Sequence, residues 1–215
     1  MSSYAVAPEH VIANEAGLRA LFEPTHDLAR IKCLDRLDPH AQAFIARSPF
    51  LCIGTQSADG RADVSPRGDP AGFVRVLDAQ TLAIPDRPGN NRLDTLSNIV
   101  ANPMVGLLFM IPGFDETLRI NGAARLVTDP EILAPMTVNG KQPKLAILVE
   151  VREVFLHCAK AFRRSKLWDP AAHRDRSEMP SLIKMILDQT TGAPDPEEMR
   201  RRDAGLEESY KNSMY

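Results

Sequence analysis

The chain is poor in cysteine, and this scarcity excludes several classes of protein. Cys33, Cys52 and Cys158 are odd in number, far apart and without a Cys-x-x-Cys spacing. Small secreted domains that depend on disulfides are rich in cysteine, and structural zinc sites need closely spaced ligands. We therefore expect reduced thiols in a cytoplasmic protein. The five histidines are scattered, so we expect no metal site.

Long apolar runs and an excess of charge are also missing. No apolar run approaches the roughly 20 residues that span a bilayer, and the N-terminus has no basic segment followed by an apolar one. We expect neither a membrane association nor a secretory signal. The formal net charge of -2 gives no general reason to expect nucleic acid as a partner, despite the basic run Lys160–Lys166.

The composition does support a folded core. Hydrophobic residues make up 44% of the 215 residues, which is a globular composition, and the length suits one domain. Short strand-like runs follow one another in the middle of the chain, at residues 50–55, 61–65, 73–77, 81–84, 104–111, 116–127 and 144–158.

Strands that are neighbours in sequence favour antiparallel pairing in a barrel or a sandwich. Ser57–Gly60 predicts a hairpin turn, and Asn121-Gly122 predicts a bulge or a close backbone approach. The run 144–158 is long enough to bend or to pair on two sides. No Gly-x-Gly-x-x-Gly follows a strand, so a Rossmann dinucleotide site is not supported.

Both ends of the chain are expected to be helical. Apolar spacing predicts one helix over Glu9–Phe22, and Asp38 is expected to cap a second helix from Pro39 to about Arg47. A third is expected from about Asn91 to Ala101, and a short one after Asp129-Pro130. Residues 181–189 and 197–210 have helical patterns, joined by a polar linker at 190–196.

The most informative stretch lies between a strand and a helix. Arg87, Asn90, Asn91 and Arg92 occupy the turn that follows the strand-like run at 81–84. Backbone N–H groups at a helix start and arginine forks are typical phosphate-binding groups. The alternative is an ordinary surface turn, in which Asn90 or Asn91 simply caps the helix. The turn alone does not decide between them.

Two further segments place polar or cationic residues at strand ends, and each also has an ordinary interpretation. Ser65-Pro-Arg-Gly-Asp69, expected in a loop, is either a site or a plain turn. The run Lys160–Trp168 is a basic turn or short helix whose charges are usually solvated. A lone tryptophan such as Trp168 is usually part of a core.

The order of elements together with four motifs resembles the FMN-binding split β-barrel family of pyridoxamine 5′-phosphate oxidase-like proteins, closest to a bacterial subgroup of FMN-dependent enzymes. The motifs are Ser65–Asp69, Ile84–Arg92, Asn98–Gly106 and Leu118–Gly122, and the resemblance covers about residues 50–168. It implies a mainly β, α+β fold: an antiparallel split β-barrel with flanking N- and C-terminal helices. The expected organisation is one FMN-binding domain over 1–215, with a helical segment at 1–48, a barrel core at 49–170 and a helical extension at 171–215.

The resemblance also implies where the cofactor FMN binds. Ser65, Arg67 and Asp69 correspond to the segment beside the flavin, and Arg87, Asn90, Asn91 and Arg92 to the phosphate turn. An Arg-x-x-Gly element from the partner subunit corresponds to Arg119–Gly122, with Arg119 and Asn121 as site residues. Lys160, Arg164, Ser165 and Trp168 are the candidates for a late basic and aromatic element that completes the site.

The expected function is that of an FMN-dependent oxidoreductase. It would transfer hydride or electrons between a reduced nicotinamide-type donor and an unidentified small molecule, as a homodimer with flavin sites at the interface. The flavin carries the chemistry, so no catalytic residue is assigned. The Arg-x-His element of the oxidase is missing near the C-terminus, which argues against pyridoxamine phosphate as the substrate. The alternatives are a non-catalytic flavin-binding or redox-sensing protein, or a deazaflavin- or haem-binding member, with His157 as a weak haem candidate.

Overall fold

The computed structural model describes residues 5–192 and 194–215. The chain divides into two compact units, Met1–Cys33 and Leu34–Tyr215, which are described separately. The helical segment expected at 1–48 begins outside the described residues, and residue 193 of the expected linker also lies outside them. The single domain over 1–215 stays a prediction.

The described part of the first unit contains short helical segments without a core. The continuous helix predicted over Glu9–Phe22 is wrong, because the Asn14 side chain accepts a backbone hydrogen bond and begins a new helix at Glu15. Phe22 is 66% exposed. Apolar spacing does not sustain a helix that has no surface to pack against. The segments are η1 (Pro8–His10), α1 (Glu15–Arg19) and α2 (Asp27–Ile31).

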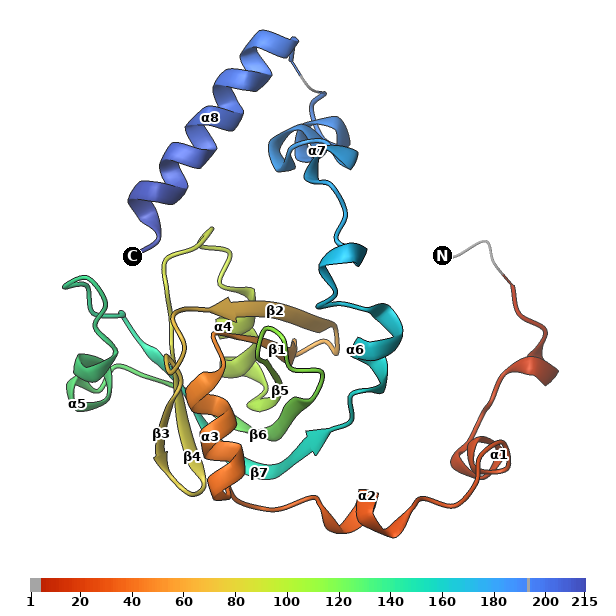
Figure 1. Ribbon diagram of the computed structural model, residues 1–215. Coiled ribbons are helices and arrows are strands. Elements are labelled where there is room, and N and C mark those ends of the chain that lie inside the picture. Colours follow the sequence, from red (N-terminus) through yellow and green to blue (C-terminus); the bar gives the residue numbers. More distant parts are fainter. Residues whose placement is uncertain (1–4, 193) are drawn as a thin grey trace. The chain divides into compact units, whose positions relative to one another are not determined.

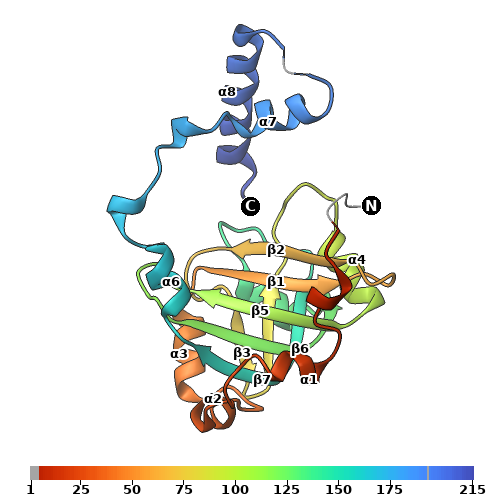
Figure 2. The same ribbon diagram turned by 90° about the vertical axis from the view of Figure 1, so that its right-hand side faces the viewer.

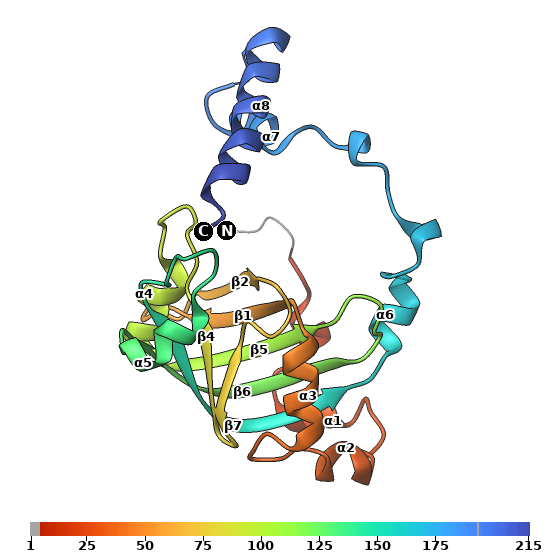
Figure 3. The same ribbon diagram turned by 60° about the vertical axis from the view of Figure 1, so that its left-hand side comes forward.

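The second unit is built on an antiparallel sheet, whose strand order is β2-β1-β5-β6-β7-β4-β3 in the described residues (Figure 1). The outermost strands β2 and β3 are not paired with each other, and β3 and β4 run across the direction of β1, β5 and β6 (Figure 3). The predicted α+β split β-barrel is therefore confirmed. The strands are β1 (Phe50–Gln56), β2 (Ala62–Gly68), β3 (Arg75–Asp78), β4 (Thr81–Pro85), β5 (Met104–Met110), β6 (Thr117–Val127) and β7 (Ala146–His157).

Several local predictions are confirmed in this unit. Ser57–Gly60 joins β1 to β2, which pair in register, and the register between β6 and β7 shifts at Asn121/Gly122. The long strand β7 pairs with β6 on one side and with β4 on the other. Asp38 caps the helix that begins at Pro39. The helices are α3 (Pro39–Arg47), α4 (Asp94–Ala101), α5 (Pro130–Leu133), η2 (Ala134–Met136), α6 (Lys160–Ser165), η3 (Pro170–Ala172), η4 (Arg176–Glu178), α7 (Leu182–Gln189) and α8 (Pro196–Ser213).

The loop predicted at Ser65–Asp69 is wrong for residues 65–68, because β2 continues through Gly68 and only Asp69 lies beyond it. Pro66 lies opposite Cys52 and Arg67 opposite Leu51 in the β1–β2 pairing. A proline, which lacks an N–H donor, is tolerated here because β2 is an edge strand. The strand places Asp63, Ser65 and Arg67 on one face, since side chains alternate along a strand.

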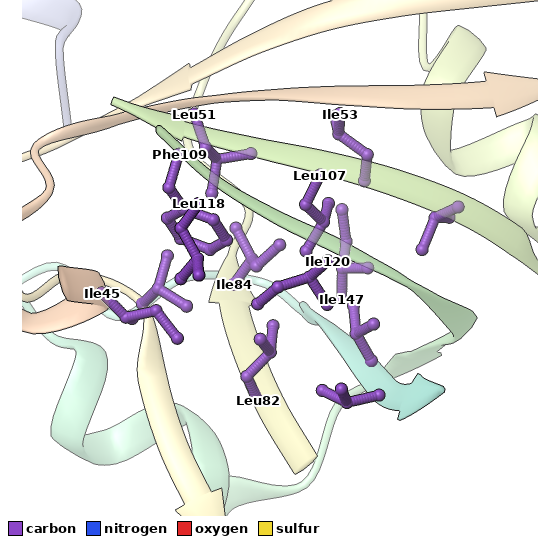
Figure 4. Packing of buried hydrophobic residues seen from close by; sticks show 14 of the residues in the cluster. Ile45, Leu51, Ile53, Leu82, Ile84, Leu107, Phe109, Leu118, Ile120 and Ile147 are labelled. Atoms are coloured by element: carbon purple, nitrogen blue, oxygen red, sulfur yellow. The ribbon is translucent and has the colours of Figure 1, made fainter. Parts of the chain in front are cut away.

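The core lies inside the curved sheet. Alternate residues of neighbouring strands meet there, and Ile45 of α3 packs among them (Figure 4). The strands β1, β5 and β6 that supply much of this core lie side by side in Figure 2. Among the described residues, no helix combines the length and apolar character that crossing a membrane requires. The residues labelled in the core are Ile45, Leu51, Ile53, Leu82, Ile84, Leu107, Phe109, Leu118, Ile120 and Ile147.

Candidate functional site

A cavity of about 890 Å³ opens beside the edge strand β2. Its walls are β2 from Asp63 to Gly68, the segment 85–96, the segment 141–144 and Tyr215. Ser65 and Arg67 therefore face the same cavity as the turn at 87–92. The structure brings together two of the three polar segments that the sequence singled out.

Arg67 is the least satisfied side chain of this cavity. Its Nη1 donates hydrogen bonds to Ser65 Oγ at 2.6 Å and to the Pro66 carbonyl at 2.8 Å. Its Nε is buried and has no hydrogen-bond partner among the described residues. Burial lowers the pKa of the guanidinium, while the carboxylates of Asp86 and Asp63 oppose that shift. An unpaired buried donor costs about 1–3 kcal/mol, so an acceptor that reached Nε through a small shift of this side chain would recover part of that cost.

Arg87 and Asp69 form a buried ion pair at the side of the cavity. Arg87 Nε donates to Asp69 Oδ2 at 2.6 Å, and the two side chains are 15% and 1% exposed. Arg87 Nη2 donates to the Met136 carbonyl at 2.9 Å, and the Tyr215 hydroxyl donates to Asp69 Oδ1 at 2.6 Å. These contacts join segments that are distant in sequence, so the pair holds the cavity wall together.

The turn before α4 differs from the prediction. Asn90 Oδ1 accepts a hydrogen bond from the Arg92 N–H at 3.1 Å, and both Asn91 and Leu93 adopt left-handed backbone, with φ of 57° and 60°. The helix therefore begins at Asp94 and not at Asn91. Leu93 occupies the N-cap position, and its side chain makes no capping hydrogen bond. The Asn90 side chain stabilises a turn that competes with the helix. Arg92 is 73% exposed and pairs with Asp94 at 2.7 Å.

A buried polar network, which sequence reasoning missed, fixes α4 to the sheet. Asn98 Nδ2 donates to Thr55 Oγ1 at 3.0 Å, and the hydroxyls of Thr55 and Thr95 donate to Asp63 Oδ2 at 3.5 and 3.3 Å. Thr55, Thr95 and Asn98 are each at most 9% exposed. Their signal in the sequence was a pair of polar residues three apart on the apolar face of α4. Their hydrogen bonds hold the Asp63 carboxylate at the cavity wall near Arg67.

Three cavity residues, Lys141, Lys144 and Tyr215, had no recognisable signal in the sequence. The first two lie in the connection that leads into β7, and the third follows α8. Neither connection contains a motif with a known spacing. Only the folded chain places their side chains beside Arg67 and Arg87.

Two predicted site residues lie on another face of the sheet. Arg119 and Asn121 alternate along β6 with buried Leu118 and Ile120, so they point away from the core. The Arg119 guanidinium lies 5.1 Å from the centre of the Phe155 ring, and Asn121 Nδ2 donates to a Glu153 carboxylate oxygen at 2.6 Å. Neither lines the cavity of its own chain.

The third polar segment is also separate from the cavity. Its residues Lys160, Arg164 and Ser165 belong to α6, and Trp168 follows that helix. Trp168 Nε1 donates to the Phe114 carbonyl at 2.8 Å, and its ring lies 5.8 Å from that of Phe162. Within one chain the segment does not complete the cavity, because it is attached to the opposite end of β7 from the 141–144 segment.

Asp86, in the cavity wall, provides a test of the local electrostatics. Burial raises its pKa, against the attraction of Arg67 and Lys144. A raised folded-state pKa means that stability is lost as the pH rises through that pKa. We therefore expect Asp86→Asn to raise the melting temperature near neutral pH, and this gain to shrink toward about pH 4.

Thermal unfolding of both proteins across that pH range checks the expectation. Asp78→Asn is the control, because hydrogen bonds from Gln80 and Thr81 lower the pKa of the exposed Asp78, so its ionised form is the favoured one. This control should show no gain at neutral pH. A gain for Asp86→Asn that is independent of pH would contradict the assignment.

The comparisons with known proteins match mainly the part of the chain that contains the sheet. The family model described as pyridoxamine 5′-phosphate oxidase matches residues 37–158. No curated protein matches the sequence. Among solved structures, HupZ from Group A Streptococcus has 17% identity and a TM-score of 0.46, with 55% of this chain and 92% of that chain covered.

Two further solved structures cover a similar region. An FMN-binding protein from Syntrophomonas wolfei subsp. wolfei has 9% identity and a TM-score of 0.43, with 54% of this chain and 81% of that chain covered. An FAD binding protein from Mycobacterium smegmatis has 16% identity and a TM-score of 0.41, with 58% and 97% covered. The family model itself spans more than half of the 215 residues. The chain therefore belongs to the pyridoxamine 5′-phosphate oxidase family.

Proposed function

We propose that this protein binds FMN in the cavity beside β2 and acts as an FMN-dependent oxidoreductase. It transfers hydride or electrons between a reduced nicotinamide-type donor and a small molecule. One observation carries the proposal: Arg67, whose buried Nε has no partner among the described residues, lines the cavity in a member of this family. A flavin offers acceptor atoms to the Arg67 guanidinium in this wall.

The charge of the cavity supports a ligand with a phosphate. Arg67, Arg92, Lys141 and Lys144 all line it, and a phosphate monoester carries about -1.5 to -2 charges near neutral pH. Guanidinium groups bind phosphate oxygens through paired hydrogen bonds. The exposed Arg92 turn is the part of the wall that can reorient its side chain toward such a group. We assign the phosphate to Arg92, with Asn90 and Asn91 beside it.

Arg87 and Asp69 have a different task in this proposal. Two donors of Arg87 are already used by Asp69 and by the Met136 carbonyl. These two residues shape the wall, while Ser65 and Arg67 contact the polar edge of the flavin. Bound FMN supplies the two-electron chemistry. Arg67 holds a positive charge at its site, which favours the added negative charge of a reduced cofactor, and Phe73 and Leu96 contribute apolar wall.

We propose a homodimer with flavin sites at its interface. The outward face of the sheet carries Val64, which is 69% exposed, and Met104, which is 45% exposed. Arg119 and Asn121 lie on this same outward side of β6. A two-fold axis through such a face makes both sites equivalent. In the dimer, this face and the late segment would approach the partner's cavity; the residues are Arg119, Asn121, Lys160, Arg164, Ser165 and Trp168.

Titration of the purified protein with FMN tests the proposed site. We expect micromolar or tighter binding, with Arg67→Ala about tenfold weaker and Arg92→Ala weaker by a similar or smaller factor, because each loses a charge-assisted hydrogen bond. Arg61→Ala is the matched control, since Arg61 is 83% exposed and pairs with Asp59 away from the cavity. Absence of FMN binding would reject the function, and equal affinity of all variants would reject the site.

An assay with NADH and NADPH separates an enzyme from a passive binder. Oxidation of the nicotinamide donor by the FMN-loaded protein supports the oxidoreductase. Stable FMN binding without turnover supports the non-catalytic alternative, in which the protein carries or senses flavin. Preference for a deazaflavin or haem over FMN would replace the proposed cofactor.

A further inference from the structure

Tyr215 reaches the cavity from a distant part of the chain. It follows α8, and its side chain meets Asp69, which lies 146 positions earlier in the sequence. Its hydroxyl donates to Asp69 Oδ1 at 2.6 Å, and its ring lies 5.5 Å from the Arg87 Cζ. Its main-chain oxygen accepts a hydrogen bond from Lys141 Nζ at 2.6 Å. Asp69, Arg87 and Lys141, from three separate segments of the chain, therefore hold one residue.

The contacts of Tyr215 are specific, but the segment around it is exposed. Met214 is 62% exposed and Tyr210, on α8, is 45% exposed. A segment with few buried apolar contacts opens locally at little cost. The hydrogen bond to Asp69 also raises the pKa of the Tyr215 phenol, so the hydroxyl keeps the proton that it donates.

We propose that Tyr215 is a latch that gates the cavity. In the closed state its ring covers the guanidinium of Arg87, and its main-chain oxygen holds Lys141. Release of the hydroxyl from Asp69 uncovers Arg87 and frees the Lys141 ammonium at the cavity wall. Both groups then face a ligand, and an anionic one gains most. The identity of that ligand as FMN rests on the proposed function, whereas the latch itself does not.

The Arg87–Asp69 pair keeps its geometry when the latch opens. Asp69 Oδ2 accepts from Arg87 Nε, and Arg87 Nη2 donates to the Met136 carbonyl, and neither hydrogen bond involves Tyr215. The pair is therefore a fixed support, and Tyr215 is the moving part. Ligand entry should accelerate when the latch is weakened, because an open state is populated more often. The exit rate should change less, because Arg87 and Lys141 face the ligand in the open state.

Hydrogen–deuterium exchange of the full chain without ligand tests the latch directly. We expect Tyr215→Phe to accelerate amide exchange in residues 206–215 by about fivefold to tenfold, because the variant loses a hydrogen bond to a charged acceptor. Tyr215→Ala should accelerate it at least as much. Tyr210→Phe is the matched control, since it removes a hydroxyl from the same helix away from the cavity, and it should leave exchange unchanged.

Stopped-flow binding of FMN supplies the second measurement. The association rate should rise by about fivefold in Tyr215→Phe, with a smaller change in the dissociation rate. Unchanged exchange in both Tyr215 variants overturns the latch, whether or not FMN binds. Faster exchange with unchanged FMN rates overturns the gating. Faster exchange in a protein that binds no FMN supports the latch and rejects only the proposed cofactor.

Discussion

Asp69→Ala is expected to lower the free energy of unfolding by about 3–5 kcal/mol, because it leaves the opposite charge of a buried ion pair uncompensated. The Asp69 side chain is 1% exposed and that of Arg87 is 15% exposed. Asp69 also accepts the hydroxyl of Tyr215, which would lose its partner. Denaturation in urea measures the change as a lower midpoint with an unchanged slope.

A second acid in the same strand hairpin provides the control. Asp59 pairs with Arg61 at 2.8 Å, but the two side chains are 58% and 83% exposed. Solvent already screens such a pair, so Asp59→Ala should change stability little. Asp69→Asn keeps an acceptor without the charge and should fall between wild type and Asp69→Ala. If Asp59→Ala and Asp69→Ala lower the free energy of unfolding equally, burial of the Arg87–Asp69 pair does not contribute to stability.

The other large effect is expected at Gly122, on β6. A Cβ at this position would lie 2.2 Å from the backbone oxygen of Glu150 and 3.2 Å from Val149 Cγ1. The first neighbour is main chain of the paired strand β7, and it cannot rotate away as a side chain would. Gly122→Ala should therefore destabilise the fold by about 1–3 kcal/mol or more through overpacking.

Thermal unfolding of Gly122→Ala against Gly54→Ala measures this effect. Gly54 lies in β1, and a Cβ there would meet its nearest neighbour, the Gly106 oxygen, at 3.6 Å, which is ordinary contact. The control should change the melting temperature much less. If the two variants melt together, the close approach of β6 to β7 is not what requires glycine at position 122.

The sequence predicted correctly those features that depend on residues close together in the chain. Asp38 caps its own helix, Ser57–Gly60 closes its own hairpin, and Asn121-Gly122 marks the register shift in its own strand. Each of these features depends on the backbone preferences of adjacent residues, and these preferences do not require contacts with distant parts of the chain. The Arg87–Arg92 turn was found for the same reason.

The failures also have physical causes. Pro66 was taken to end β2, although an edge strand tolerates proline because no neighbour needs its N–H. Asn91 was taken to begin α4, although the Asn90 side chain stabilises a turn that delays the helix to Asp94. The sheet around Pro66 decided the first case, and a local side-chain hydrogen bond that competes with the helix decided the second.

The local pattern of the chain was sufficient to identify the strands, the hairpins, most helices and a cationic turn. The split β-barrel came from the resemblance of four motifs to a known family. The cavity was different. The register of β2 against β1 decides that Ser65 and Arg67 face it, and chain packing decides that Arg87 is paired by Asp69 and covered by Tyr215. Tyr215 and Asp69 are 146 positions apart, and only the folding of the chain brings them together. Burial then strengthens their hydrogen bond, and no spacing motif in the sequence predicts this contact.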